Sequence, residues 1–292
     1  MDQQEWLARE FEDYRPHLRA VAYRMLGSLS EADDALQDAW LRLSRADTSE
    51  VENLRGWLTT IVARVALNTL RSRKTRREQP LDVRVPDPII DPADGTDPEH
   101  EALLADSVGL ALLVVLETLT PAERLAFVLH DMFAVPFEQI APIVERSPEA
   151  TRQLASRARR RVRGAAPVPD ADLTDQWEIV EAFLAAAREG DFDALVAVLD
   201  PDVVLRADGG LTGLSEHLQG AETVASQALL WSRVDLTTRR VLINGAAGVV
   251  AFIHGQPFSI AAVTIRNGKI VELDFLTDPE RIAQLDLTEL GD

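Results

Sequence analysis

Apolar residues near the start of the chain recur with the spacing of amphipathic helices. Between Ser30 and Leu43 they form one unbroken helical stripe, made of Ala32, Ala35, Leu36, Ala39, Trp40 and Leu43. Ser30 is followed three residues later by Asp33, a pattern typical of a capping box, which predicts that the helix starts there. The residues that lie off the stripe are Asp33, Asp34, Gln37, Asp38 and Arg42.

The next helical pattern runs from Asn53 to about Arg73. Its inward positions are Leu54, Trp57, Leu58, Ile61, Val62, Val65 and Leu70. Its exposed side carries Thr60, Arg64, Asn68 and Arg71, and the helix leads directly into the basic run "RSRKTRR". A cationic run at the end of one helix is often only compensation of the helix dipole, so this cluster alone does not indicate a function.

A proline-rich acidic segment separates this helical region from the next. The stretch "PLDVRVPDPIIDPADGTDPEH" holds five prolines and six acidic residues. The prolines forbid a regular helix, and the charge argues against a packed core. We therefore predict a linker over residues 81–98.

Helical periodicity resumes at about Glu99 and ends in a helix-turn-helix pattern. Thr120 and Pro121 begin one helix, a short helix follows from Phe137 to Val144, and Ser147 with Pro148 begins the last one. The inward positions predicted for that last helix are Ala150, Leu154, Ala158 and Val162. Its predicted outward positions are Thr151, Arg152, Gln153, Ser156, Arg157 and Arg160. Polar residues of this kind in the first exposed turn are typical of a recognition helix.

After a second linker, residues 165–175, the pattern changes from helical to mixed. Two helices around Gly190 precede strands such as "GVVAFIH", "SIAAVTI" and "KIVELDFL". Asn-Gly pairs at Asn244 and Asn267 separate neighbouring strands, a strong hairpin signal. The expected fold is multidomain: two all-α domains, the second with the helix-turn-helix, followed by an α+β cone.

Charge distribution points to nucleic acid. The chain carries a formal net charge of -18, yet Arg71–Arg77 and Arg157–Arg163 each hold five positive charges in seven residues. A strongly acidic protein is repelled by DNA as a whole, so DNA binding needs such local basic faces. The chain has no cysteine, no apolar run of membrane-spanning length and no signal-peptide pattern, so we expect a cytoplasmic protein.

Three blocks of sequence together resemble extracytoplasmic-function (ECF) factors of the sigma-70 family of RNA polymerase. They are "YRPHLRAVAYRMLGSLSEADDALQDAWLRL", "NLRGWLTTIVARVALNTLRSRKTRR" and "LTPAERLAFVLHDMF…RSPEATRQLASRARRRVR". The resemblance implies sigma region 2 at 1–80 and sigma region 4 at 99–164. It also implies core RNA polymerase and promoter DNA as partners.

The resemblance also assigns roles to residues. Those expected to approach the minus-ten element are Arg64, Asn68, Arg71, Arg73 and Lys74, with the preceding loop "DTSEVENLRG" holding a flipped base. Those expected to read or flank the minus-thirty-five element are Thr151, Arg152, Gln153, Ser156, Arg157 and Arg160. Arginine and glutamine suit base edges, and the trailing arginines suit phosphates. The face expected to dock on core polymerase carries Asp33, Asp34, Gln37, Asp38 and Arg42.

Residues 176–292 look like a SnoaL-like (NTF2-like) domain, and the fusion resembles the SigJ-type subgroup. "RVPDP" at Arg84 resembles its linker motif W-L-P-E-P, "DGG" at Asp208 its D-G-G-G, and "DPERI" at Asp278 its N-P-D-K-L. The expected regulatory or pocket residues are Asp208, Gly209, Gly210, His217, Trp231, His254, Asp278 and Pro279. A small molecule in the pocket is an expected further partner.

We interpret the chain as a sigma factor whose tail modulates promoter-specific initiation, without catalytic residues, metal or cofactor. No histidine or carboxylate cluster has metal-ligand spacing. One alternative is a SnoaL-like isomerase or cyclase fused to a DNA-binding module, because the tail's fold is shared with enzymes. A further alternative is an ordinary helix-turn-helix repressor.

Overall fold

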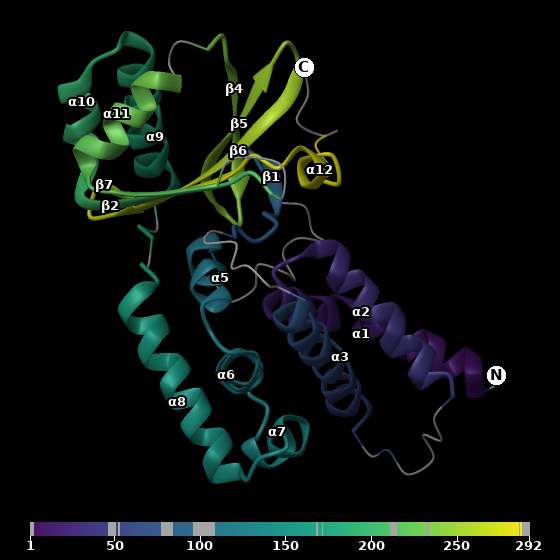
Figure 1. Ribbon diagram of the computed structural model, residues 1–292. Helices are drawn as coiled ribbons and strands as arrows, with labels where there is room; N and C mark the ends of the chain where they lie inside the picture. The colour runs from purple at the N-terminus through teal and green to yellow at the C-terminus, as the bar shows by residue number, and fades with distance from the viewer. Residues whose placement is uncertain are drawn as a thin grey trace. The chain divides into compact units, whose positions relative to one another are not determined.

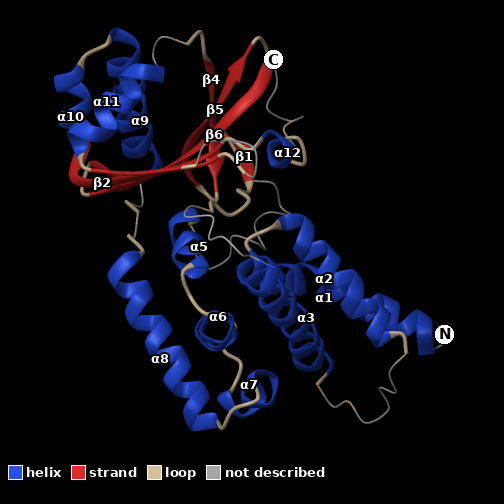
Figure 2. Ribbon diagram, viewed as in Figure 1, coloured by secondary structure: helices blue, strands red, loops and turns tan. Residues whose placement is uncertain are grey.

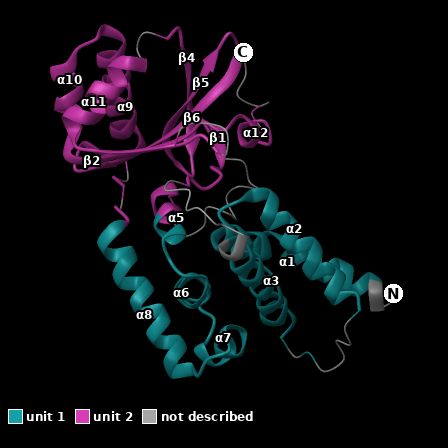
Figure 3. Cartoon of the chain, viewed as in Figure 1, with its two compact units in different colours: residues 1–80, 98–106, 115–165 teal, residues 81–97, 107–114, 166–292 magenta. Residues whose placement is uncertain are grey.

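The computed structural model of the chain describes residues 3–45, 51, 53–76, 84–95, 109–167, 169–170, 172–210, 215–231, 234–285 and 287. The chain divides into two compact units (Figure 3). The first, here called the helical unit, comprises residues 1–80, 98–106 and 115–165. The second, the sheet unit, comprises residues 81–97, 107–114 and 166–292. The linker between the two predicted sigma regions therefore belongs to the sheet unit.

The helical unit is built from two groups of three helices (Figure 1). The first group is α1 (Gln3–Leu26), α2 (Leu29–Leu43) and α3 (Leu54–Arg76). The second is α6 (Pro121–Phe127), α7 (Phe137–Val144) and α8 (Pro148–Ala165), with a π-helical turn η1 (Val128–Met132) after α6. α5 (Leu110–Glu117) spans the boundary between the units. α3 contacts both α6 and α7, which joins the two groups.

The start of α2 differs from the sequence prediction by two residues. Ser28, not Ser30, is the N-cap: its backbone is extended, and its hydroxyl accepts the Glu31 amide at 3.4 Å. The predicted stripe is otherwise confirmed, since five of its members are buried: Ala32, Ala35, Leu36, Ala39 and Leu43. Trp40 is half-buried and packs on Phe11, with ring centroids 5.3 Å apart.

The turn between α7 and α8 forms without glycine. Glu145 follows the last residue of α7 with φ 58°, in the left-handed region that usually favours glycine. The backbone amides of Glu145 and Arg146 both donate to the carbonyl of Ala141, which ends the helix. Pro142 lies inside α7 without ending it. The helix-turn-helix predicted from the sequence therefore exists, with glutamate in the position of the customary glycine.

The sheet unit contains one seven-stranded sheet in the order β1-β4-β5-β6-β7-β2-β3. Its strands are β1 (Ile90–Pro92), β2 (Leu199–Asp208), β3 (Glu216–Gln219), β4 (Thr237–Ile243), β5 (Ala246–Ile253), β6 (Gln256–Arg266) and β7 (Lys269–Leu276). All neighbouring strands are antiparallel except β2 and β7, which are parallel. Its helices are α9 (Leu173–Glu189), α10 (Phe192–Val198), α11 (Ala221–Trp231) and α12 (Pro279–Ile282).

Three tight turns set the register of β4 to β7. Asn244-Gly245 and Asn267-Gly268 each have two successive positive φ angles, as the sequence predicted for these hairpins. His254-Gly255 forms a third turn of the same kind, with φ 51° and 77°. The expectation that His254 is a pocket residue is therefore wrong: it is an exposed turn residue, at a position where histidine is tolerated better than most side chains.

The core of the sheet unit lies between the sheet and the helices α9, α10 and α11, which lie on the same side of the sheet (Figure 2). Val180 and Leu195 from the helices are buried against Val203, Val249 and Leu273 from the strands. The strand residues of this core come from β2, β5, β6 and β7, mostly at alternate positions, as the period of two along a strand requires. The predicted α+β fold is thus present.

The proline-rich linker packs more closely than its composition predicts. Val85 and Ile89 are each 1% exposed, and residues 90–92 form β1, which pairs with β4. The Ile89 amide donates to the side-chain carbonyl of Asn244 at 3.1 Å, and the Asn244 amide donates to the Ile89 carbonyl at 2.9 Å. The prolines do exclude helix, but apolar residues between them supply a buried face. The expectation of an unpacked segment was therefore wrong for residues 85–92.

Candidate functional site

The outward face of α8 carries most of the side chains expected to meet DNA. Arg152, Gln153, Ser156, Arg157 and Arg160 are exposed. Thr151 is an exception: it is fully buried, and its hydroxyl donates to the Ser147 carbonyl at 2.9 Å. The inward stripe is formed by Thr151, Ala155 and Ala158, one position away from part of the stripe that the sequence predicted. The prediction that Thr151 reads DNA is wrong because a short hydroxyl side chain at this position satisfies its own helix backbone.

Acidic partners within the helical unit hold several arginines of α8. Arg157 and Arg161 both contact Glu123, whose side chain is 7% exposed, and Arg159 pairs with Asp131. Burial raises the pKa of Glu123, but hydrogen bonds from Thr120 and Arg157 and the charge of Arg161 outweigh it, so that the pKa is lowered. Arg152 lies over the ring of Phe137, 5.2 Å from its centroid. Charge counting along the sequence could not reveal these pairs, since Glu123 lies 34 residues from Arg157.

α3 presents a shorter cationic face than expected. Arg64, Asn68 and Arg71 are exposed on successive turns. Arg73 instead turns inward: its Nε donates to Glu31 at 3.1 Å and one terminal nitrogen to the Leu26 carbonyl at 3.0 Å. The expectation that Arg73 faces DNA is therefore wrong, because this side chain joins α3 to the end of α1. The side chain of Lys74 and most of the loop before α3 lie outside the described residues.

The polar face of α2 is exposed as predicted. Asp33, Asp34, Gln37, Asp38 and Arg42 are all accessible to solvent. Asp33 accepts two hydrogen bonds from Arg19 of α1, at 2.9 and 3.0 Å. Leu41 on the same helix is 45% exposed. A face that combines carboxylates with an exposed leucine has the chemistry of a docking surface for a basic partner.

Buried arginines join the two helix groups of the helical unit. The Nε of Arg124 in α6 donates to the Arg24 carbonyl near the end of α1 at 3.1 Å, and a terminal nitrogen donates to Glu117 at 2.7 Å. The side chain of Arg124 is 2% exposed. The guanidinium of Arg24 lies 4.7 Å from the ring centroid of Phe133. Sequence periodicity did not single out either arginine.

His17 of α1 completes this contact. Its ring meets the edge of Phe133, with centroids 5.2 Å apart, and its two nitrogens hydrogen-bond Thr59 and Arg55 at 3.1 Å each. Burial lowers the pKa of His17 to about 4, and the charges of Arg55 and Arg24 add to the shift. His17 is therefore neutral at physiological pH and accepts the hydrogen bond from Arg55.

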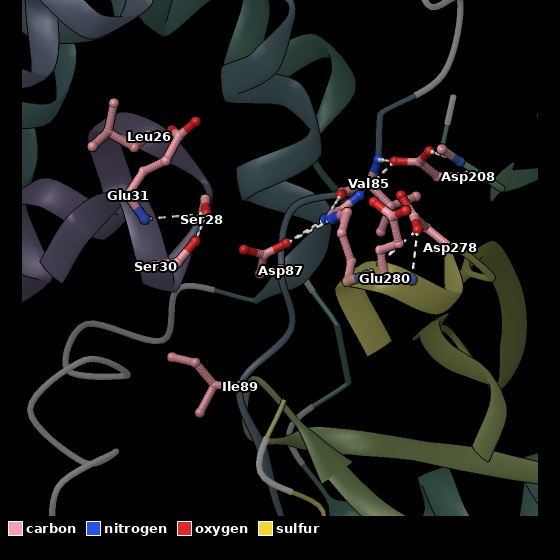
Figure 4. A network of polar contacts seen from close by, with 12 residues as sticks. Leu26, Ser28, Ser30, Glu31, Val85, Asp87, Ile89, Asp208, Asp278 and Glu280 are labelled. Atoms are coloured by element: carbon pink, nitrogen blue, oxygen red, sulfur yellow. Dashed lines mark hydrogen bonds and ion pairs between the residues drawn. The ribbon is translucent and has the colours of Figure 1, made fainter. Parts of the chain in front are cut away.

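Asp208 and Arg281 anchor the linker to the rest of the sheet unit. Figure 4 shows Asp208 beside Val85 and Asp87 of the linker. The Asp208 carboxylate, 3% exposed, accepts the Val85 amide at 2.9 Å and a terminal nitrogen of Arg281 at 2.8 Å. The Nε of Arg281 donates to Asp87 at 2.9 Å, and its other terminal nitrogen to the Val85 carbonyl at 2.6 Å. One guanidinium thus holds both backbone and side chain of the linker, the fork geometry for which arginine is suited.

The motifs around Asp208 and Asp278 shape this anchor. Gly210 has φ 69°, and a Cβ there would lie 2.0 Å from a carboxylate oxygen of Asp278. Asp278 is the N-cap of α12, and Pro279 is the first residue of that helix. Gly209 is buried beside Asp208. Of the expected regulatory residues, these five therefore lie in or next to the linker anchor.

A cavity of about 680 Å³ opens within the sheet unit, on the opposite side of the sheet from the Asp208 carboxylate. Its lining includes Phe183, Leu205, Trp231, Phe258 and Phe275. The expected pocket residue Trp231 is therefore part of it. Neither His217, which is exposed on β3, nor His254 belongs to the lining, so the expectation that these two are pocket residues is wrong.

A buried ionic cluster occupies the face of the sheet opposite the cavity. Arg206 donates to Asp274 at 3.0 Å and to Glu272 at 3.1 Å. Burial raises the pKa of Asp274 to about 6, against the attraction of Arg206 and with the support of the neighbouring Glu272 charge. Burial disfavours the charge of Arg206, but its two carboxylate partners raise its pKa overall.

Neither a metal centre nor a membrane span is found in the described part of the chain. The described residues include no group of three or more histidine, cysteine, aspartate or glutamate side chains arranged to hold a metal ion. None of the described helices is long and apolar enough to cross a bilayer.

Comparison with known proteins assigns the helical regions. A Sigma-70 region 2 model matches residues 11–76, and a Sigma-70, region 4 model matches residues 109–162. The ECF RNA polymerase sigma factor SigJ of Mycobacterium tuberculosis H37Rv is 37% identical, over 96% of this chain and 94% of that protein. The chain belongs to the ECF sigma factors. The probable ECF sigma factor SigI of M. tuberculosis CDC 1551 is 33% identical, over 100% of this chain and 99% of that protein.

The sheet unit is also part of that likeness. The crystal structure of M. tuberculosis SigJ matches this ECF sigma factor with a TM-score of 0.78 and 35% identity, over 96% of this chain and 99% of that chain. The family resemblance and the fold predicted from the sequence are therefore confirmed. In this ECF sigma factor, α2 and α3 fall within the region 2 match. α8 falls within the region 4 match except for its last residues.

Proposed function

We propose that this ECF sigma factor directs core RNA polymerase to promoters and that its sheet unit controls it through the linker between regions 2 and 4. The observation that carries the proposal is the anchor in which Arg281 and Asp208 bind Val85 and Asp87. The linker is the covalent connection between the two promoter-reading regions. A linker held at 85–92 gives those regions less reach than a free one of the same length.

For promoter reading, we propose two surfaces with different tasks. On α8, Arg152 and Gln153 read base edges of the minus-thirty-five element, while Arg157 and Arg160 contact phosphates. On α3, Arg64, Asn68 and Arg71 face the minus-ten element. Their exposure supports this division. Arg157 must exchange Glu123 for a phosphate when DNA binds.

For polymerase binding, we propose the α2 face of Asp33, Asp34, Gln37, Asp38 and Arg42. Reversal of Asp33, Asp34 and Asp38 to lysine should prevent holoenzyme formation without unfolding the chain, because all three are exposed.

We further propose that the sheet unit works without chemistry of its own. The absence of both candidate histidines from the cavity lining supports this proposal over an isomerase or cyclase. The carboxylate of Asp208 is likewise engaged by the linker and by Arg281. The expected role is regulation of the linker.

Asp208→Asn should change multi-round transcription severalfold while leaving core binding unaltered. The substitution removes the negative charge that Arg281 binds but keeps the size and shape of the side chain at position 208. The linker should therefore be released more readily. The matched control is Asp202→Asn, the same change at an exposed position of the same strand. Equal transcription by wild type, both variants and a truncation at Gly164 would show that the sheet unit has no regulatory role.

Arg152→Ala should weaken binding to the cognate upstream element by about 1–3 kcal/mol and relax specificity there, because a base contact is lost. Arg160→Ala should instead weaken binding to all DNA sequences alike and lower the dependence on salt, because a phosphate contact is lost. Quantitative DNA binding by holoenzyme, on cognate and scrambled duplexes, distinguishes the two. The same loss on both duplexes for both variants would contradict the division of roles.

A further inference from the structure

The cavity of the sheet unit has the size and walls of a small-molecule site. Its volume of about 680 Å³ lies within the roughly 300–1,000 Å³ that ligand pockets occupy. Aromatic rings come from the helices and from the sheet: Phe183 and Trp231 from the former, Phe258 and Phe275 from the latter. Trp231, at the end of α11, is 46% exposed, and its ring centroid lies 5.7 Å from that of Phe258. An exposed tryptophan beside an apolar cavity marks its mouth.

Hydroxyl groups form a row across the sheet wall of this cavity. Thr238 pairs with Ala251, and Ala251 pairs with Ser259. The pairing of Ile260 with Leu276 continues the row to Thr277. Thr238, Ser259 and Thr277 all line the cavity. A ligand lying on this wall therefore meets groups that both donate and accept hydrogen bonds.

Charged groups contribute little to the lining. Arg188 and Glu216 are the charged residues among the described lining residues. Glu216 accepts a hydrogen bond from Gln227 at 3.0 Å, and the Nε of Arg188 donates to the Leu184 carbonyl at 3.3 Å. Arg188 belongs to α9 and not to the sheet wall, so an anion lying on this wall would lose its hydration without a cationic partner on the same wall. The lining thus favours an uncharged aromatic molecule with hydroxyl or carbonyl groups along one edge.

We infer that this cavity binds such an uncharged aromatic molecule, and that occupancy is transmitted to the linker through Thr277 and Asp208. The regulatory half of the inference rests on the proposed function, whereas the binding half does not.

Direct bonds connect the cavity wall with the linker anchor. The amide and hydroxyl of Thr277 both donate to the Asp208 carbonyl, at 2.9 and 3.2 Å. Ala207 and Thr277 line the cavity, whereas the side chain of Asp208 points to the other face of the sheet and accepts the Val85 amide. A ligand that accepts the Thr277 hydroxyl removes one of the two bonds that Thr277 donates to the Asp208 carbonyl. The linker should then be held less firmly.

Binding can be tested on the full chain with two probes that differ by one charge. N-phenyl-1-naphthylamine is a neutral aromatic amine that fluoresces when buried, and 1-anilinonaphthalene-8-sulfonate is its anionic counterpart. We expect saturable binding of one neutral probe per chain, and binding of the sulfonate at least about tenfold weaker. Absence of saturable binding by the neutral probe, or equal affinity for both, would overturn the ligand assignment.

Cavity variants locate the bound probe. Ala228→Phe fills the helix wall, and Trp231→Ala removes a ring from the mouth, where the exposed position should leave the fold intact. Both should lower affinity severalfold, with thermal unfolding as the check on folding. Unchanged affinity in the folded Trp231→Ala and Ala228→Phe variants would place the probe elsewhere and refute the proposal.

Hydrogen exchange in a peptide covering residues 84–92 tests the coupling. We expect faster exchange when a neutral aromatic ketone, 6-propionyl-2-dimethylaminonaphthalene, is bound, because its carbonyl can accept the Thr277 hydroxyl. The response should be smaller in Thr277→Val, which still binds this probe. Thr223→Val, the same change at an exposed position of α11, is the control and should respond like wild type. Probe binding without any change in exchange would overturn the coupling alone. The Asp208→Asn transcription experiment uses no probe, so its result decides the proposed function separately.

Discussion

Arg124→Met should lower the stability of the helical unit by about 3–5 kcal/mol, because it breaks a buried ion pair and leaves the partner groups behind. Glu117, whose side chain is 15% exposed, would lose its cation, and the Arg24 carbonyl would lose its donor. Methionine keeps much of the side-chain volume, so the expected loss reflects polar groups rather than a void. The result should be strongly accelerated hydrogen exchange in α1 and α6.

The control for this experiment is Arg157→Met. Arg157 also pairs with a glutamate of α6, but its side chain is 48% exposed. An exposed pair of this kind contributes roughly 0–1 kcal/mol. Local exchange is the suitable measurement because the chain has two units and a single unfolding midpoint is not defined for it. Equal effects of the two substitutions would show that Arg124 does not join the helix groups.

Asp274→Asn should make the sheet unit more stable at pH 8 and reduce its dependence on pH. The folded-state pKa of Asp274 is raised from 3.8 to about 6, so the folded state holds its proton more tightly than the unfolded state. Protonated Asp274 therefore contributes its full stabilisation of the folded state below about pH 4. This contribution is lost as the pH rises through about 6, where the buried carboxyl group ionises. The shift corresponds to roughly 3 kcal/mol at most. Asparagine carries no charge to desolvate and can still accept from Arg206.

Scanning calorimetry at pH 5 and pH 8 measures this effect at the transition of the sheet unit, which is assigned by comparison with the truncation at Gly164. The wild-type chain should unfold at a lower temperature at pH 8 relative to Asp274→Asn, and the difference should shrink at pH 5. Asp202→Asn, at an exposed position of β2, should not alter the unfolding temperature at either pH. A variant that is less stable than wild type at pH 8 would mean that the charge pair with Arg206 outweighs the burial of Asp274.

Local features of the fold were predictable where a short-range rule governs them. The Asn244-Gly245 and Asn267-Gly268 turns follow from the backbone conformation that such pairs favour. The stripe from Ala32 to Leu43 follows from helical periodicity. His254 was misassigned because histidine suggested chemistry, while the glycine that follows it already indicated a turn.

Long-range partners could not be read from periodicity. The motif at Asp208 and the motif "DPERI", which contains Arg281, were each singled out, but the bond between these two residues, 73 positions apart, could not be read from either motif. Arg73 and Glu31 are 42 residues apart, and their pairing removes Arg73 from the surface that its helix position suggested. The prediction for the linker was wrong because composition averages over many residues. Burial of Val85 and Ile89 depends instead on their contacts with distant parts of the sheet unit, which composition does not reveal.

The pairing of β1 with β4 also covers an edge strand through which two copies of the protein could otherwise associate. Ile90 to Pro92 lie against Val241 to Ile243, where the sheet would otherwise end in an uncovered strand. An uncovered strand of this type presents unsatisfied amides and carbonyls that readily recruit a strand from another molecule. Release of β1 from β4 would therefore leave the edge of β4 open to such pairing. The anchor made by Asp208 and Arg281 holds the linker that contains β1, and in this way it also disfavours aggregation through β4.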